Sequence, residues 1–183
     1  VKAKDPQILR KNVKKTMALI KKSKRPVILA GNGIRVAGAY NDFLKLVKQL
    51  QIPVLTASCA NDLMYASNPF YFGNPGLIGD RAANFIIQNS DLVIGIGARF
   101  NFKTISFNYK AFAREAKIVA VDIDKNELNK KSINPKLKIN ADAKDFIKEL
   151  LNERKREKLP KWSWWVDKCR SWLKTFDKNL PQY

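Results

Sequence analysis

Short apolar runs alternate with segments of helical periodicity along most of this chain. The runs are three to five residues long and rich in Val, Ile and Leu, as buried strands are, and they lie at residues 26–30, 52–56, 92–96, 118–121 and 137–139. Between them, apolar residues recur three and four positions apart, which is the spacing of one face of an α-helix. The helices predicted from this spacing cover residues 6–24, 40–50, 80–89, 107–115, 126–130 and 143–152.

This alternation of strands and helices predicts an α/β fold with a parallel sheet and right-handed crossovers. The chain has 183 residues, of which 45% are hydrophobic. That is enough for one full core and too little for two large domains. We therefore expect a single α/β domain over residues 1–153, opened by the amphipathic helix 6–24.

The composition changes after Glu153. The segment 154–183 is basic and holds all four tryptophans of the chain, at positions 162, 164, 165 and 172. Side chains of this size need a surface to cover. Two interpretations remain open: the segment packs back on its own domain as a terminal helix, or it is a linker that leads toward a C-terminal domain absent from this chain.

The formal net charge of +19 is concentrated at the two ends of the chain. Residues 1–25 carry ten Lys and Arg against one acidic residue, and residues 154–183 carry nine against three. Nucleic-acid binders tend to combine a basic face with exposed aromatic residues or a recognition helix, and the predicted strand ends show neither. We interpret the basic ends as solvated faces of amphipathic segments and do not expect nucleic acid as a partner.

Several chemistries are excluded by residue type. The chain has no His, so the usual zinc sites and the Ser-His and Cys-His nucleophile pairs cannot form. Cys59 and Cys169 lie far apart and are expected to be free thiols. We therefore predict no catalytic and no metal-binding residues. No apolar run reaches the roughly 18 residues that span a bilayer, and the N-terminus lacks the apolar block of a signal peptide, so we expect a cytoplasmic protein.

Residues suited to binding a nucleotide follow three of the predicted strands. The first strand breaks at Gly31-Asn32-Gly33, the third runs into Gly97 and Arg99, and the fourth ends at Asp122. Carboxyl ends of parallel strands meet at one edge of a sheet, where ligands bind. Glycine lets the backbone approach a phosphate, although a tight turn alone also explains the two glycines after the first strand.

The charged groups at this edge also have two interpretations each. Arg99 could pair with a phosphate or form a surface salt bridge. Asp122 and Asp124 could accept hydrogen bonds from ribose hydroxyls, while Asp124 could instead cap the helix that follows it. Asp142 is predicted to cap the helix 143–152.

A long loop over residues 67–79 carries further glycines. Gly73, Gly76 and Gly79 recur every three residues and are followed by Asp80-Arg81. Long loops within compact domains are often functional. The spacing suits a backbone cradle for a ligand, and an ordinary turn explains it nearly as well.

Longer segments follow one another in a recognisable order: RPVILAGNGI, IPVLTAS, FGNPGLIGDRAANFIIQNSDLVIGIGARF, AREAKIVAVDIDKNEL and INADAKDFIKEL. Together they resemble the central domain of the thiamine diphosphate enzymes of the acetolactate synthase type. The end of the chain, WLKTFDKNLPQY, is similar to that family's connector into its C-terminal domain. The resemblance implies a Rossmann-like parallel sheet of about six strands with helices on both faces.

The resemblance also implies a larger parent enzyme with three domains. Its N- and C-terminal domains would be the partners of this one, within a homo-oligomer, and they would build the site for thiamine diphosphate and magnesium. The parent would decarboxylate a 2-oxo acid and transfer the resulting carbanion equivalent. The family's catalytic glutamate segment and its Gly-Asp-Gly motif are not in this sequence, so no thiamine chemistry is expected from this chain alone.

In acetolactate synthases the central domain holds FAD in an extended, largely structural role, which makes FAD a candidate cofactor here. The positions that match the family's cofactor site are Gly31, Gly33, Thr56, Gly76, Gly79, Gly97, Arg99, Asp122, Asp124 and Asp142.

Two departures from the family pattern fall where flavin and substrate would approach. Asn101-Phe102-Lys103 replaces paired aspartates and an arginine, and Cys59-Ala60-Asn61 replaces a turn that contains glycine. They imply a divergent parent with another 2-oxo acid or an aldehyde as substrate, and they leave the retention of FAD open. A purely structural domain without nucleotide is the main alternative, and a basic nucleic-acid-binding module is a weaker one.

Overall fold

A computed structural model describes residues 5–177 and contains a parallel sheet in the order β2-β1-β3-β4-β5. The strands are β1 (Pro26–Ala30), β2 (Val54–Thr56), β3 (Leu92–Ile96), β4 (Lys117–Asp122) and β5 (Leu137–Asn140). This confirms the α/β fold and all five predicted strand positions. The strand order reverses between β1 and β3, and ligands bind at the carboxyl side of such a switch point.

An irregular extended segment lies beside the outer edge of β2. Val54 N–H donates to the carbonyl of Phe70 (2.7 Å), Phe72 N–H to that of Val54 (3.0 Å), and Thr56 N–H to that of Gly73 (3.0 Å). The segment runs parallel to β2 but forms a single bridge, between Val54 and Tyr71. The described sheet therefore has five regular strands, and this segment occupies the place of a sixth.

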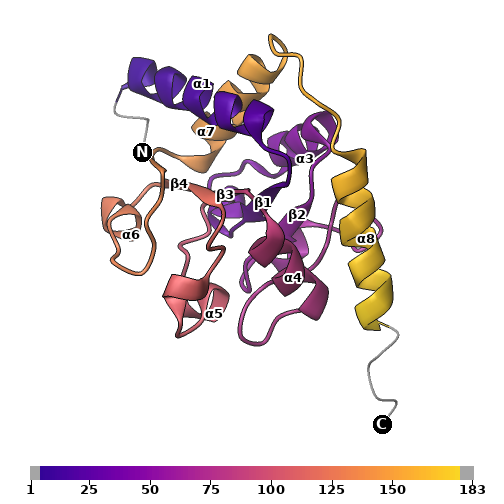
Figure 1. The fold of residues 1–183 in the computed structure, drawn as a ribbon. Helices are drawn as coiled ribbons and strands as arrows, with labels where there is room; N and C mark the ends of the chain where they lie inside the picture. Colours follow the sequence, from indigo (N-terminus) through magenta and orange to yellow (C-terminus); the bar gives the residue numbers. More distant parts are fainter. Residues whose placement is uncertain (1–4, 178–183) are drawn as a thin grey trace.

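Helices cover both faces of the sheet (Figure 1). They are α1 (Pro6–Lys22), α2 (Gly33–Val36), α3 (Tyr40–Leu50), α4 (Arg81–Asn89), α5 (Phe102–Ile105), α6 (Lys125–Leu128), α7 (Ala143–Arg154) and α8 (Ser163–Asp177), with 3-10 turns η1 (Asn61–Leu63) and η2 (Tyr109–Ala111). One layer contains α1, α3 and α7, while α4 and α8 pack together in the other. None of these helices is long and apolar enough to cross a membrane.

The first helix begins and ends for local reasons. The side chain of Asp5 caps α1 by accepting hydrogen bonds from the N–H groups of Gln7 and Ile8. Val13, Met17 and Ile20 are buried on one side of the helix, and the lysines lie on the other. The amphipathic pattern thus fixes which side faces the core.

The predicted helix over residues 107–115 is wrong. The chain instead forms α5 five residues earlier, where Asn101 Oδ1 accepts the N–H of Thr104, and then only the 3-10 turn η2. Ser106 (φ 68°) and Ala113 (φ 44°) adopt positive φ, which an α-helix cannot contain. Phe112 is buried while Phe107 stays at the surface, so the apolar residues of this segment do not form one helix face.

The tryptophan-rich segment packs on its own domain through α8. Trp162 Nε1 donates to the carbonyl of Ser23 (2.9 Å) and Trp165 Nε1 to that of Pro26 (3.1 Å). Both rings are buried, as is Cys169, and burial raises the pKa of the Cys169 thiol. Trp164 stays half exposed. The described part of the tail thus follows the first of the two interpretations.

The last six residues of the predicted linker, 178–183, lie outside the described residues, as does that part of the connector motif. The boundary between residues 153 and 154 stays a prediction.

Candidate functional site

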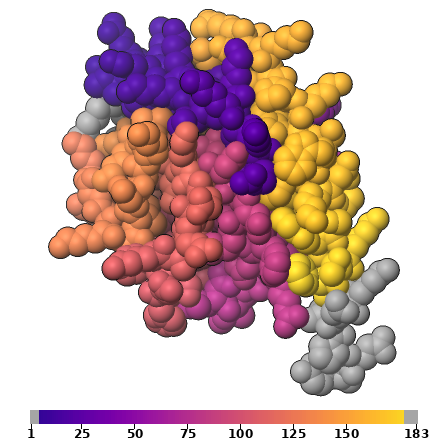
Figure 2. Space-filling view, in the orientation of Figure 1, coloured from indigo at the N-terminus to yellow at the C-terminus, as the bar shows by residue number. Residues whose placement is uncertain are grey.

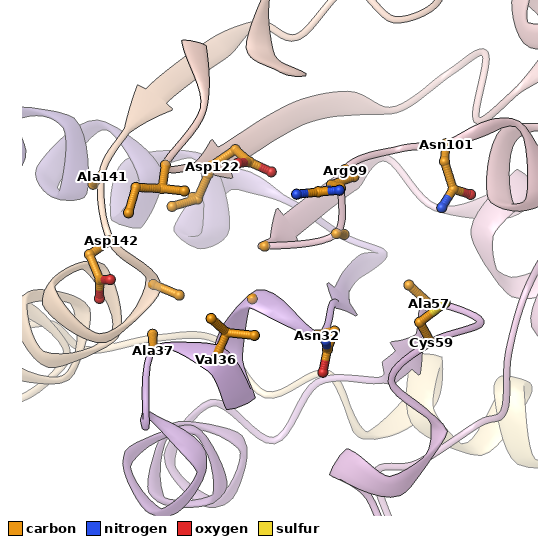
Figure 3. Close-up of a pocket in the computed structure, with 16 residues that line it drawn as sticks. Asn32, Val36, Ala37, Ala57, Cys59, Arg99, Asn101, Asp122, Ala141 and Asp142 are labelled. Carbon is orange, nitrogen blue, oxygen red and sulfur yellow. The ribbon is translucent and has the colours of Figure 1, made fainter. Parts of the chain in front are cut away.

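A cleft of about 430 Å³ opens at the carboxyl edge of the sheet, over the switch point between β1 and β3. Residues that follow all five strands contribute to its walls. Among the ten predicted cofactor residues, those that line it are Gly33, Gly97, Arg99, Asp122 and Asp142. Residues far apart in the sequence, such as Asn32 and Asp142, therefore meet around one space (Figure 3).

Glycines bring the ends of β1 and β3 into direct backbone contact. Gly31 N–H donates to the carbonyl of Ile96 (2.9 Å), and Gly33 N–H to that of Gly97 (3.2 Å). A Cβ atom on Gly31 would lie 2.0 Å from the Gly97 oxygen, and one on Gly33 would lie 2.7 Å from Gly97 Cα. Close packing of the two turns accounts for these glycines without any ligand, and Gly31 is not among the residues that line the cleft.

The turn after β3 holds Arg99 in an unusual backbone conformation. Gly97, Arg99 and Phe100 all have positive φ, at 57°, 55° and 45°. Such a conformation in residues other than glycine costs of order 1–3 kcal/mol and persists only where the surroundings enforce it. The ring of Phe100 is buried against Gly95, where a Cβ atom would lie 2.3 Å from it.

A second contact holds the same turn from the segment that follows α6. Lys130 Nζ donates to the carbonyl of Arg99 (3.3 Å) and pairs with the carboxylate of Glu127. The Lys130 hydrogen bond thus holds the backbone of Arg99, and its exposed side chain lines the cleft.

Asp122 is the buried carboxylate of the cleft. It ends β4 with 9% of its surface exposed, and burial raises its pKa above the usual 3.8. The N–H of Asp124 donates to its Oδ1 (3.0 Å), and the charge of Arg99 opposes the rise. Figure 3 shows Arg99 and Asp122 pointing toward one another on one side of the cleft. A cation and a partly desolvated carboxylate thus share one wall.

The two other predicted aspartates cap helices. Asp124 accepts the N–H of Asn126 (2.8 Å) at the start of α6, and Asp142 accepts the N–H of Lys144 (2.7 Å) at the start of α7. Asp124 is exposed and does not line the cleft, whereas Asp142 does. Helix capping is thus the role that the geometry gives Asp124.

Three predicted residues lie away from the cleft. The buried Thr56 hydroxyl contacts the side chains of Asn61 (3.3 Å) and Tyr71 (3.1 Å). Gly76 bonds the amide of Asn84 through both its N–H and its carbonyl, and Gly79 N–H donates back to the Gly76 carbonyl. These contacts close the loop on itself, as a turn does.

Sequence reasoning predicted Gly33 on the opposite wall but missed several other residues there. Asn32, Val36 and Ala37, from the turn and short helix after β1, line the cleft, as do Cys59 and Asn101. The last two belong to the segments singled out as departures from the family pattern. Attention to every residue just beyond a strand end would have found this wall. Within residues 5–177, no three His, Cys, Asp or Glu side chains gather as a metal site would require.

Comparison with known proteins gives a family match over most of the chain. The model of the family described as "Thiamine pyrophosphate enzyme, central domain" matches residues 13–150. The probable acetolactate synthase large subunit of Methanococcus aeolicus is 38% identical over 143 residues, 78% of this chain and 24% of that protein. The acetolactate synthase isozyme 1 large subunit of Escherichia coli is 33% identical over 150 residues, 82% of this chain and 26% of that protein.

A relative with another named activity matches the same part of the chain. The 3D-(3,5/4)-trihydroxycyclohexane-1,2-dione hydrolase 2 of Bacillus cereus is 33% identical over 135 residues, 74% of this chain and 20% of that protein. The chain spans only about a fifth to a quarter of these relatives.

Proposed function

Because the chain belongs to the family of thiamine pyrophosphate enzyme central domains, we propose that it is a scaffolding domain whose cleft binds a nucleotide, with FAD as the first candidate. The proposal rests above all on one observation, the placement of Arg99 beside the buried Asp122 at the switch point.

The residues of the cleft fit a nucleotide in chemistry and size. A carboxylate has about four acceptor sites, so the single backbone bond to Asp122 leaves acceptor capacity for ribose hydroxyls. The guanidinium of Arg99 suits a phosphate because its fixed donors can bind two oxygens at once. The cleft of about 430 Å³ lies within the range of small-molecule sites. Bound FAD would be held here by Arg99, Asp122 and the backbone around Gly33 and Gly97.

We further propose that the parent is an acetolactate synthase-like enzyme that decarboxylates a 2-oxo acid and transfers the carbanion equivalent. Support comes from the named activities of most relatives, which carry about three quarters of their length outside the matched part. Thiamine diphosphate and magnesium would supply the carbanion chemistry, in sites that the family resemblance implies for the other domains. The N- and C-terminal domains of the parent would be the partners of this chain, within a cytoplasmic homo-oligomer.

A thermal-shift titration with FAD, ADP and NAD, at low and moderate salt, tests nucleotide binding directly. Ligand at a hundredfold excess over Kd stabilises the folded state by about 2.7 kcal/mol. For a chain of this size that corresponds to a rise in Tm of several degrees. We expect such a shift with FAD or ADP, with little dependence on salt.

The Arg99→Gln variant should weaken nucleotide binding about tenfold, as expected for loss of a charge-assisted hydrogen bond. Arg114→Gln is the matched control, because Arg114 is also exposed and does not line the cleft. No shift with any nucleotide would support the purely structural alternative. A shift seen only with a short DNA duplex and lost at moderate salt would support the nucleic-acid module.

A further inference from the structure

One short segment, which runs from Asp124 through α6 to Lys130, contacts both charged groups of the cleft. At its start, the N–H of Asp124 donates to Asp122 Oδ1 (3.0 Å). Just after α6, Lys130 Nζ donates to the carbonyl of Arg99 (3.3 Å). Figure 2 shows the orange surface of this segment beside the red surface of the chain that follows β3. The segment is therefore placed to influence where both Asp122 and Arg99 stand.

The guanidinium of Arg99 depends on its own backbone for its position. The side chain lines the cleft, yet none of the salt bridges within residues 5–177 involves it. The backbone has a φ of 55° at Arg99 and of 45° at Phe100. Residues other than glycine keep such a conformation only where contacts enforce it. A contact that holds this turn therefore also directs the guanidinium.

Two contacts of different kinds act on this turn. The buried ring of Phe100 packs against Gly95 and lies edge-on to the ring of Phe112, with centroids 6.1 Å apart. That packing anchors the residue after Arg99 to the core. The hydrogen bond from Lys130 acts on Arg99 itself, at the carbonyl that the left-handed backbone presents. Removing Lys130 should therefore loosen Arg99 while the core packing of Phe100 stays in place.

Lys130 is itself held by a neighbour. Glu127, three residues earlier, pairs with Lys130 Nζ through its Oε2. The two side chains are 18% and 34% exposed, and partly buried pairs are screened by salt less than exposed ones. A lysine side chain is otherwise flexible, so the pair restricts where its nitrogen can donate. After burial, the charge of Glu127 also raises the pKa of Asp122, so the pair acts on both charged groups of the cleft.

We propose that Lys130, held by Glu127, is a positioning residue for Arg99 and thereby raises the affinity of the cleft for the phosphates of a nucleotide. This role rests on the proposed nucleotide site, although Lys130 does not line the cleft. Without its hydrogen bond, the backbone of Arg99 gains freedom to relax toward the negative φ that most residues prefer. The guanidinium then spends less time where a phosphate binds.

The proposal predicts a loss confined to one part of the ligand. The guanidinium of Arg99 suits phosphate oxygens, whereas the carboxylate of Asp122 suits ribose hydroxyls. Lys130 donates to Arg99 and not to Asp122. Its loss should weaken ligands that carry phosphate and spare those that do not. ADP and adenosine, which differ only in the diphosphate, are the matched pair of probes.

The test measures the Kd of both probes for wild type and for Lys130→Met. ADP should bind about fivefold more weakly to the variant, as the loss of one hydrogen bond predicts, and adenosine binding should not change. In an Arg99→Gln background, Lys130→Met should have no further effect on ADP. Lys130→Arg, which keeps a donor and a charge, should retain most of the affinity. An equal loss for both probes, or the same loss in the Arg99→Gln background, would overturn the proposal.

Lys131→Met is the matched control, because it removes the same charge from the next residue, which is exposed and does not line the cleft. It should leave the ratio of the ADP and adenosine affinities nearly unchanged. A fall in that ratio as large as with Lys130→Met would show that the positive charge attracts phosphate from a distance, and would overturn a positioning role.

Hydrogen exchange without ligand separates this role from nucleotide binding itself. The amides of residues 99–101 should exchange about threefold faster or more in Lys130→Met than in wild type, because the turn opens more often. Lys131→Met should leave them unchanged. Equal rates in wild type and Lys130→Met would overturn the positioning role even if nucleotide binds. A wild type that binds no nucleotide would instead overturn the proposed function, and the exchange rates would still decide whether Lys130 positions Arg99.

Discussion

The two edges of the sheet are built in opposite ways. At the amino edge, ahead of β1 and β3, the carboxylate of Asp91 accepts hydrogen bonds from Ser23 Oγ and from the N–H groups of Lys24 (2.8 Å) and Arg25 (2.9 Å). Trp162, just before α8, and Trp165, within it, seal the same edge by donating to the carbonyls of Ser23 and Pro26. Polar groups here are satisfied within the chain, and large rings are buried.

At the carboxyl edge, by contrast, the polar side chains have fewer partners within the chain, and an aromatic ring is left at the surface. Asp122 has a single backbone donor and a raised pKa, Arg99 has a strained backbone, and Phe107 lies at the surface. Both edges carry a partly buried aspartate and aromatic rings, so residue type alone does not separate them. The difference lies in whether the chain itself supplies the hydrogen-bond and packing partners: at the amino edge it does, and at the carboxyl edge an open cleft remains.

Truncating one aromatic ring at each edge should give the largest difference in the free energy of unfolding between two variants. Trp165→Ala should lower the free energy of unfolding by about 3–5 kcal/mol, because it empties a buried site and removes a hydrogen bond. Phe107→Ala should change it by less than about 0.5 kcal/mol, as exposed substitutions do. Urea unfolding of both variants measures this, and equal losses would show that the edges are not distinct.

Removing the amino-edge carboxylate should have a moderate effect. Asp91→Ala leaves three donors without their acceptor and should cost about 1–3 kcal/mol at neutral pH. Burial tends to raise the pKa of Asp91, but these hydrogen bonds outweigh it and lower the pKa below 3.8. The stability that Asp91 contributes is therefore present above its unfolded pKa and is lost as the pH falls through its folded pKa.

This pH dependence is checked by measuring the free energy of unfolding of the wild type and of Asp91→Ala from strongly acidic to neutral pH. The difference in free energy between the two proteins should narrow as the solution becomes acidic. A difference that stayed constant over this range would mean that Asp91 acts through packing and not through its charge.

Neutralising Asp122, the carboxyl-edge aspartate, should change the free energy of unfolding less than removing Asp91 does, and it should raise that free energy instead of lowering it. Burial raises the pKa of Asp122, so its folded-state advantage is present below the unfolded pKa and is lost as the pH rises through the folded pKa. Asp122→Asn keeps an oxygen for the N–H of Asp124 and should stabilise the protein at neutral pH by less than about 1 kcal/mol, since solvent screens the charge.

Thermal unfolding of Asp122→Asn at neutral pH and below the unfolded pKa of aspartate measures this gain, which should vanish at the lower pH. A loss of stability at neutral pH would place Asp122 among the structural carboxylates, together with Asp91, and would remove the contrast between the edges.

Local pattern was sufficient for most of the fold. Each predicted strand is present because a short apolar run can be buried on both faces only within a covered sheet. Asp142 caps α7 as predicted because a cap involves only neighbouring residues. The helix over residues 107–115 failed because a repeat of apolar positions does not reveal positive φ at Ser106 and Ala113.

The candidate site was predicted in part. Gly33, Gly97, Arg99, Asp122 and Asp142 meet at one cleft because the carboxyl ends of parallel strands share an edge. Thr56, Gly76 and Gly79 have the expected residue types, but the Thr56 hydroxyl contacts Asn61 and Tyr71, and the two glycines are engaged within their own loop. Residue type and spacing cannot distinguish a backbone N–H that is available to a ligand from one that a neighbouring carbonyl already accepts.

The sequence by itself determined the strands, the amphipathic α1 and the family, since these depend on periodicity and on residues in order along the chain. Tertiary structure decided which aromatic rings are core. Trp165 and Phe107 are both large apolar rings in sequence, yet α8 returns to the amino edge while α5 projects beside the cleft. Burial depends on contacts between segments far apart along the chain, such as Trp165 and Pro26, which no local pattern records.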